Sequence, residues 1–314
     1  MQALLHAPAS SAVGVNQVAV SRDTRLVATG DVNIMIRVYE GDEVLWEKWV
    51  GSHDAKVRVT QRVRSLQFSP GGEMLLVAAA DRLWAFGSRT GEVLWEYTPP
   101  RSLGFLIVSP LSISISQSNE VAVSFDNGRI RFTRTDGSLI GQWKDVDVQS
   151  HVALLRDEKR MVGCDTAINV FDLYQRKRAA RIRLPERAIA MSVGGPSEQV
   201  AVRTIHEVLI ADLETEKIVA RAKTHVGIPL VAFHPFEPII AVSEQFGVTL
   251  MDGECRTIRQ IDTPLGMGSH SRFGRPAIWN HPDSRVKVLS LTFTADGKSL
   301  KVGGSDGLVH DFPV

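Results

Sequence analysis

The sequence has few of the features that mark disulfide-stabilised, secreted or membrane-spanning proteins. Its 314 residues include only two cysteines, Cys164 and Cys255, too few for a disulfide framework. No Asn-x-Ser/Thr glycosylation site occurs, and Pro110 interrupts the longest apolar stretch before it could span a bilayer. The opening residues, MQALLHAPASSAVGV, lack the basic region and apolar core of a secretion signal. We therefore expect a cytoplasmic protein with no membrane insertion.

Catalytic signatures and a dominant charge are also absent. The formal net charge is +1, so no overall field favours nucleic acid or membrane surfaces. HExxH, CxxC, phosphate-binding glycine loops, nucleophile elbows and dinucleotide fingerprints do not occur. His270, His281 and Asp283 share one stretch, but their spacing is irregular and no cysteine supports a zinc site. We predict no catalytic residues, no cofactor and no metal.

The sequence does contain a repeat of short, apolar β-strands separated by polar turns. The clearest copy is VRSLQFSPGGEMLLVAAADRLWAFGSRTGEVLWEY, residues 63–97. The ends of the first strands in successive copies are separated by 48, 47, 40, 38, 40 and 60 residues. These reference positions are Val20, Phe68, Ile115, Leu155, Val193, Phe233 and Phe293. A base period near 40 residues is typical of a four-stranded propeller blade.

Seven copies predict an all-β, seven-bladed β-propeller with four antiparallel strands in each blade. We place the blades of this single domain, residues 1–314, at about 12–49, 63–98, 111–144, 151–184, 188–223, 228–262 and 288–314 plus 2–7. The last copy ends after three strands. We therefore expect the N-terminal segment to supply its outer strand, because an open ring would leave an exposed sheet edge.

The copies resemble WD-repeat propellers over essentially the whole chain. Three segments are similar to turns of that family: SPGG (69–72), TADGK (294–298) and GSDGLVHDF (304–312). We align Asp172, Asp212, Asp252 and Asp311 with the aspartate of the family's Trp-Asp dipeptide. No Gly-His or Trp-Asp pair occurs, so the blades are divergent. The resemblance implies a scaffold for protein–protein interaction.

One segment, LWAFGSRTGEVLWEY, also resembles a blade of the quinoprotein-type propellers. That resemblance would imply a quinone cofactor, but those enzymes are about twice as long and carry a pair of adjacent cysteines, whereas Cys164 and Cys255 are 91 positions apart. Packing explains the same residues. Gly91 permits the turn, and Trp46, Trp95 and Trp143 can fill the gap between blades near the rim.

Three long connections between blades, residues 50–62, 99–110 and 263–287, are expected on one face of the propeller. Long loops on a rigid scaffold usually carry function. Basic and aromatic residues gather in them, the composition of an interface hot spot. The predicted partner-binding residues are Lys56, Arg58, Arg62, Arg101, Phe105, Arg272, Phe273, Arg275, Trp279 and Arg285.

We therefore predict a non-enzymatic scaffold whose long loops bind an acidic or phosphorylated segment of a protein partner, within a larger multiprotein complex. Bidentate arginine contacts are the physical basis. Single-stranded nucleic-acid or phospho-ligand binding on the same face is one alternative. Another is a small-molecule hydrolase or isomerase in the channel mouth. Its candidate carboxylates are Glu120, Asp126, Asp165 and Glu244.

A second basic cluster runs from Arg176 to Arg178 and includes Arg181 and Arg183. It is expected near the opposite face. We interpret it as a solvated turn and an edge strand whose charges prevent pairing with another strand. A second binding surface is the alternative interpretation.

Overall fold

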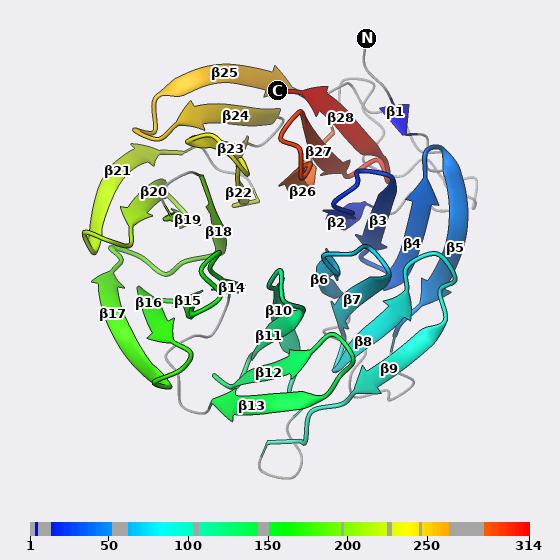
Figure 1. Cartoon of the computed structure of the whole chain (residues 1–314). Coiled ribbons are helices and arrows are strands. Elements are labelled where there is room, and N and C mark those ends of the chain that lie inside the picture. Colours follow the sequence, from blue (N-terminus) through cyan, green and yellow to red (C-terminus); the bar gives the residue numbers. More distant parts are fainter. Residues whose placement is uncertain are drawn as a thin grey trace.

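The computed structural model describes residues 4–5, 14–51, 62–102, 107–143, 151–195, 198–224, 228–244, 247–263 and 286–314. Seven four-stranded antiparallel sheets stand around a central axis as the blades of a propeller (Figure 1). The first strand of each blade lies closest to the axis and the fourth lies at the rim. The predicted fold class is therefore confirmed.

Blades 1 to 4 follow one another along the chain. Blade 1 contains β2 (Val15–Val20), β3 (Leu26–Asp31), β4 (Met35–Glu40) and β5 (Glu43–Trp49). Blade 2 contains β6 (Val63–Phe68), β7 (Met74–Ala79), β8 (Arg82–Gly87) and β9 (Val93–Tyr97). Blade 3 contains β10 (Pro110–Ile115), β11 (Glu120–Phe125), β12 (Ile130–Arg134) and β13 (Leu139–Trp143). Blade 4 contains β14 (His151–Leu154), β15 (Arg160–Cys164), β16 (Ala167–Asp172) and β17 (Lys177–Arg183).

Blades 5 to 7 complete the ring. Blade 5 contains β18 (Ala190–Gly194), β19 (Gln199–Arg203), β20 (Glu207–Asp212) and β21 (Lys217–Lys223). Blade 6 contains β22 (Val231–Phe233), β23 (Ile239–Glu244), β24 (Gly247–Asp252) and β25 (Thr257–Asp262). Blade 7 contains β26 (Val288–Phe293), β27 (Ser299–Gly304) and β28 (Val309–Pro313) from the C-terminal part, and β1 (Leu4–Leu5) from the N-terminal part.

The two ends of the chain close the ring together, as predicted. β1 pairs antiparallel with β28, with Leu4 opposite His310 and Leu5 opposite Val309. Blade 7 also contacts blade 1 through a small apolar cluster of Val15, Val18, Val27 and Val309. β1 thus supplies the fourth strand of blade 7 and joins the two ends of the chain.

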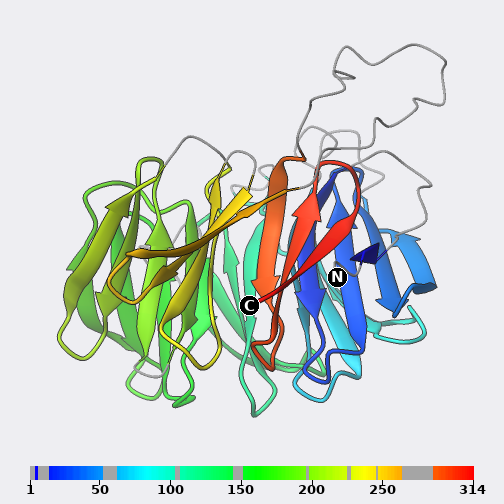
Figure 2. The same ribbon diagram turned by 90° about the horizontal axis from the view of Figure 1, so that it is seen from above.

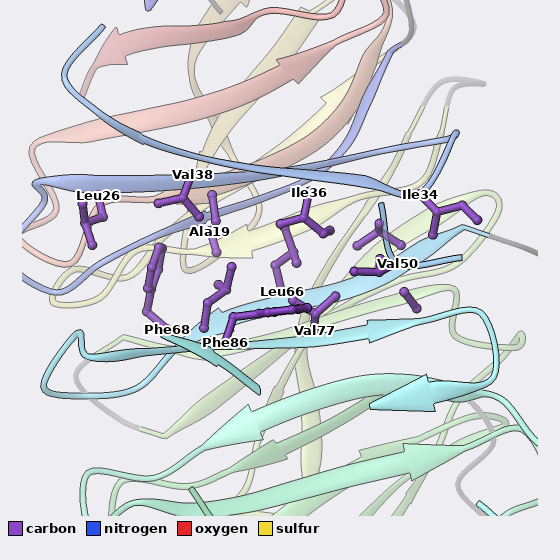
Figure 3. Packing of buried hydrophobic residues seen from close by; sticks show 14 residues of the cluster. Ala19, Leu26, Ile34, Ile36, Val38, Val50, Leu66, Phe68, Val77 and Phe86 are labelled. Carbon is purple, nitrogen blue, oxygen red and sulfur yellow. The ribbon is translucent and has the colours of Figure 1, made fainter. Parts of the chain in front are cut away.

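The hydrophobic core is divided among the spaces between neighbouring blades. One cluster joins blade 1 to blade 2, where Ile36 and Val38 lie across from Leu66 and Phe86 (Figure 3). The second strands are buried on both faces, and β7 and β11 have five buried residues each. This burial explains why β7 is apolar throughout and why β11 is apolar apart from Glu120 at its start and the buried Ser124. The outer strand β21 instead alternates between exposed and half-buried residues, because its outer face meets solvent.

Strand direction determines which connections share a face. Consecutive strands are antiparallel, so connections between blades emerge on the same face as the turns between second and third strands. We call this the top face. The turns between first and second strands, and between third and fourth strands, lie on the bottom face. In the side view the strands run between these two faces (Figure 2).

Two of the rim tryptophans occupy the same place in successive blades. Trp46 of β5 donates from Nε1 to the Ser88 carbonyl oxygen of blade 2 at 2.8 Å. Trp95 of β9 donates in the same way to the Thr135 carbonyl oxygen of blade 3 at 2.7 Å. Trp143 lies two register positions further along β13 and packs 5.3 Å, centroid to centroid, from both Phe132 and Phe171. All three tryptophans thus contact the next blade or its turn, as the packing interpretation expected.

The register corrects one alignment made from the sequence. Asp172, Asp212 and Asp252 each pair with the first residue of the preceding strand, and their carboxylates accept backbone N–H groups of the following turn. Asp311 instead pairs with the third residue of β27, Lys301, and forms a 2.7 Å ion pair with it. Pro313 occupies the place equivalent to the other aspartates, so the alignment at Asp311 was wrong by two residues.

The described residues contain no helix, and hence no helix long and apolar enough to cross a membrane.

Candidate functional site

Two of the ten predicted partner-binding residues, Arg62 and Arg101, belong to the described part of the chain. Both are exposed and both lie at the top face of blade 2. Arg62 immediately precedes β6, and its carbonyl oxygen accepts a hydrogen bond from the Ala80 N–H at 3.4 Å. Arg101 follows β9 on the rim side. The other eight predicted residues lie outside the described residues; they are Lys56, Arg58, Phe105, Arg272, Phe273, Arg275, Trp279 and Arg285.

A pocket of about 480 Å³ adjoins Arg101 and lies where the predicted loops 50–62 and 99–110 begin and end. Blade 1 contributes its last outer-strand residue and the start of the connection to blade 2. Blade 2 contributes the top turn between its second and third strands. The lining residues are Trp49, Gly51, Asp81, Arg82, Trp84, Thr98, Pro99, Arg101, Ile107 and Val108.

The polar groups of this pocket are mainly hydrogen-bond donors. The Trp84 indole N–H is buried and makes no hydrogen bond. Such a group is costly unless a ligand or water accepts from it. The guanidinium of Arg82 lies 5.6 Å from the Trp84 ring centroid, 3.7 Å from Asp81 and 3.4 Å from Glu96. With Arg101 at the rim, the pocket offers two arginines and an indole N–H, and the carboxylates of Asp81 and Glu96 lie beside one of the arginines, Arg82.

Sequence reasoning identified Arg101 but missed Arg82 and Trp84. Both lie at the start of a third strand, where an alternating pattern explains them as ordinary strand residues. One feature of the sequence could have identified this site. Asp81 and Arg82 lie in a top-face turn of the blade that stands between the long loops 50–62 and 99–110. Only the packing of blade 1 against blade 2 brings Trp49 and Trp84 to the same pocket.

A second basic residue, Arg64, lies beside Arg62 at the mouth of the central channel. Burial lowers the pKa of Arg64 in β6, and the charge of Arg62 lowers it further, while Asp126 of blade 3 opposes the shift. Burial raises the pKa of Asp126, although its hydrogen bond from the Ser109 N–H and the charge of Arg64 act in the other direction. Arg64 is the one charged residue of the strand VRSLQF, a signal that could have identified it.

The four carboxylates considered for a channel-mouth enzyme do not lie on one face. Glu120 begins β11 at the bottom face, whereas Asp126, Asp165 and Glu244 lie at the top ends of blades 3, 4 and 6. Asp165 forms a 2.5 Å ion pair with Arg187. Within the described residues, no three His, Cys, Asp or Glu side chains are grouped as metal ligands. His270, His281 and Asp283 lie outside those residues.

Comparison with known proteins places the chain by its fold. No protein-family model matches the sequence, and no curated protein matches it either. Among solved structures, the chain is similar to the structure of U3-55K, a WD-repeat propeller, with a TM-score of 0.77 and 10% sequence identity. The similarity covers 100% of this chain and 98% of that one. At this identity the likeness shows a shared seven-bladed β-propeller fold.

Proposed function

We propose that the chain is a non-enzymatic, WD-repeat-like scaffold in a larger assembly, and that its top face binds an acidic or phosphorylated segment of a protein partner. The pocket beside Arg101 carries this proposal. Its two arginines and the unpartnered Trp84 N–H would bind a carboxylate or phosphate, because charge-assisted hydrogen bonds to such groups are short and strong. Trp49, Pro99 and Ile107 give the same segment an apolar surface.

The fold supports a binding role in a second way. A propeller holds its loops on a rigid ring, so the residues of the pocket are fixed before a partner arrives, and less conformational freedom is lost on binding. U3-55K has a similar fold over 100% of this chain and 98% of its own. The predicted residues of loops 50–62, 99–110 and 263–287 would extend the pocket into a wider interface.

Fluorescence anisotropy with two labelled peptides, one rich in glutamate and one with phosphoserine at the same positions, tests the pocket. Arg101→Glu should weaken binding of both peptides about tenfold or more. Trp84→Phe keeps an aromatic ring but removes the indole N–H, and should weaken binding severalfold. Arg134→Glu, an exposed arginine at the bottom end of β12, is the matched control. Equal affinity in all four proteins would overturn the assignment of the pocket.

A pull-down from the native source extends the test to the other predicted loop residues. The wild-type chain is compared with an Arg272→Glu/Arg275→Glu/Trp279→Ala variant after nuclease treatment. Protein partners lost from this variant and from Arg101→Glu would support one continuous interface. Binding that disappears with nuclease and falls linearly with the logarithm of salt concentration would favour nucleic acid instead.

A further inference from the structure

The rim of blades 4 and 5 has a basic surface that is separate from the top-face pocket. β17 and β21 together contain seven lysines and arginines and no acidic residue. The two strands are the outer strands of neighbouring blades and follow each other around the rim (Figure 1). We call the surface that they form the basic wall.

The basic residues of the two strands occupy matching register positions. Lys177 pairs with Asp172 and Lys217 pairs with the equivalent Asp212. Each strand then has a bulge before its central residues. After the bulge, Arg181 matches Arg221, and Arg183 matches Lys223. All six side chains are exposed, so the wall presents three pairs of positive charges from the bottom face to the top face.

The same register positions are acidic in blades 1 and 2, on another part of the rim. Glu43 and Glu92 lie where blades 4 and 5 have Lys177 and Lys217, and Glu47 and Glu96 lie where they have Arg181 and Arg221. Arg37 neutralises Glu47 at 3.2 Å, and Arg82 neutralises Glu96 at 3.4 Å.

Five of the six matched basic residues of the wall lack this internal compensation. Lys177, Arg183, Lys217, Arg221 and Lys223 form no ion pair with any described residue. The positive charges of these five residues are therefore available to a partner protein, whereas Glu47 and Glu96 of blades 1 and 2 already pair with arginines of the same blade.

Protection of exposed strand edges does not by itself explain the wall. Every outer strand has an unpaired edge, yet β9 and β13 contain no lysine or arginine. A groove of about 580 Å³ also lies between the two basic strands. Leu184, Pro185, Ile218 and Val219 give it an apolar lining, and Val219 is 50% exposed. Arg183 from blade 4 and Arg221 from blade 5 line the same groove.

We propose that the basic wall binds an acidic polypeptide segment of a partner protein. An aliphatic side chain of this segment would fill the groove between Arg183 and Arg221, and carboxylates on both sides would contact the three basic pairs. The lining is aliphatic and contains no aromatic ring on which a base could stack. Polypeptide therefore fits the groove better than single-stranded nucleic acid, although both would be attracted by the charge.

The test uses a labelled peptide of about twelve residues of glutamate and aspartate with two central leucines, long enough when extended to follow a full strand. Arg183→Glu/Arg221→Glu/Lys223→Glu should weaken its binding to the full-length chain at least tenfold. Replacing the two leucines with serine should weaken binding to wild type severalfold. The matched control, Arg22→Glu/Arg25→Glu/Lys298→Glu, makes the same charge change in exposed bottom-face turns and should bind as wild type does.

Three outcomes would overturn the proposal. Equal peptide affinity in wild type and the wall variant would show that the wall is not the binding surface. Tighter binding of an oligothymidylate of similar length, lost in the wall variant, would assign the wall to nucleic acid. Self-association of wild type in light scattering, lost in the wall variant, would assign it to a second copy of the chain. Thermal melting of each variant checks folding.

Discussion

The indole of Trp46 lies directly against Gly91 of the next blade, so close that a Cβ at residue 91 would lie 2.8 Å from the ring. Trp95 has the same relationship to Gly137, where a Cβ would lie 3.1 Å from the ring. Both glycines have a positive φ, of 67° and 85°. Each tryptophan thus needs a glycine in the neighbouring blade for two reasons, the space for its ring and the backbone of the turn.

The arrangement is reversed between blades 3 and 4. Gly141 of β13 stands at the register position of Trp46 and Trp95, and Arg176 stands at the turn position of Gly91 and Gly137. A Cβ at Gly141 would lie 3.8 Å from the Arg176 guanidinium. Here the large side chain, Arg176, belongs to blade 4, and the glycine, Gly141, belongs to blade 3. The two blades therefore keep their contact with different residues.

Gly91→Ala should lower the free energy of unfolding by about 2 kcal/mol, because it adds both backbone strain and overpacking against Trp46. Chemical denaturation measures the change. Gly41→Ala is the matched control, since Gly41 also has a positive φ, of 59°, but no atom lies within 4 Å of an added Cβ. If the two substitutions cost the same, packing against Trp46 contributes nothing.

Deleting residues 1–8 removes β1 and leaves blade 7 with three strands and an open edge. We expect the melting temperature to fall by about 5 °C, since a loss of roughly 1 kcal/mol shifts it by about 2–4 °C in a chain of this size. Scanning calorimetry measures the shift. Deleting residues 1–3, which keeps β1, is the control. A melting curve unaffected by the longer deletion would show that β1 does not latch the ring.

The stability of the protein should fall between pH 6.5 and about 4 because of His151. Burial lowers the pKa of His151 from 6.5 to about 4, and its Nδ1 atom makes no hydrogen bond. In this pH range the unfolded chain binds a proton that the folded chain excludes. The free energy of unfolding therefore decreases as the pH falls, by up to about 1.4 kcal/mol per pH unit, and this contribution is absent above pH 6.5.

Denaturation of wild type and His151→Gln across this range isolates the effect. The variant should lose this contribution to the slope, whereas His206→Gln, at an exposed histidine, should keep it. An identical slope in wild type and His151→Gln would contradict the assignment.

Arg203 is fully buried, and its Nη1 donates to the carbonyl oxygens of Thr204, Ile205 and Glu207 at 2.9, 3.4 and 3.3 Å. Arg203→Ala should cost about 3 kcal/mol, because it removes the guanidinium donor of the Thr204 and Ile205 oxygens and opens a cavity, while the Glu207 oxygen still accepts from the Thr204 N–H at 2.9 Å. Arg203→Lys should cost less. Urea titration measures both, with the exposed Arg134→Ala as a control expected within about 0.5 kcal/mol of wild type. A cost near zero for Arg203→Ala would mean that water replaces the guanidinium.

The sequence by itself determined the number of blades, the order of the strands and the closure of the ring. Strand periodicity and turn residues are local properties, so the spacing near 40 residues predicts the blades without knowledge of their neighbours. The closure follows by counting, because the last copy has three strands and β1 is the remaining segment. Gly91 was likewise assigned correctly to the turn, and Trp95 to packing between blades.

Only the tertiary structure decided which side chains meet. The register of blade 7 places Pro313, and not Asp311, opposite the first residue of β27, so the pairing of Asp311 with Lys301 was not obtained from the sequence motif. The pocket beside Arg101 and the groove beside Arg183 each lie between blades, where residues about 40 positions apart in the sequence come together. Contacts of this kind depend on how one blade packs against the next, and that packing is set by the ring rather than by any one repeat.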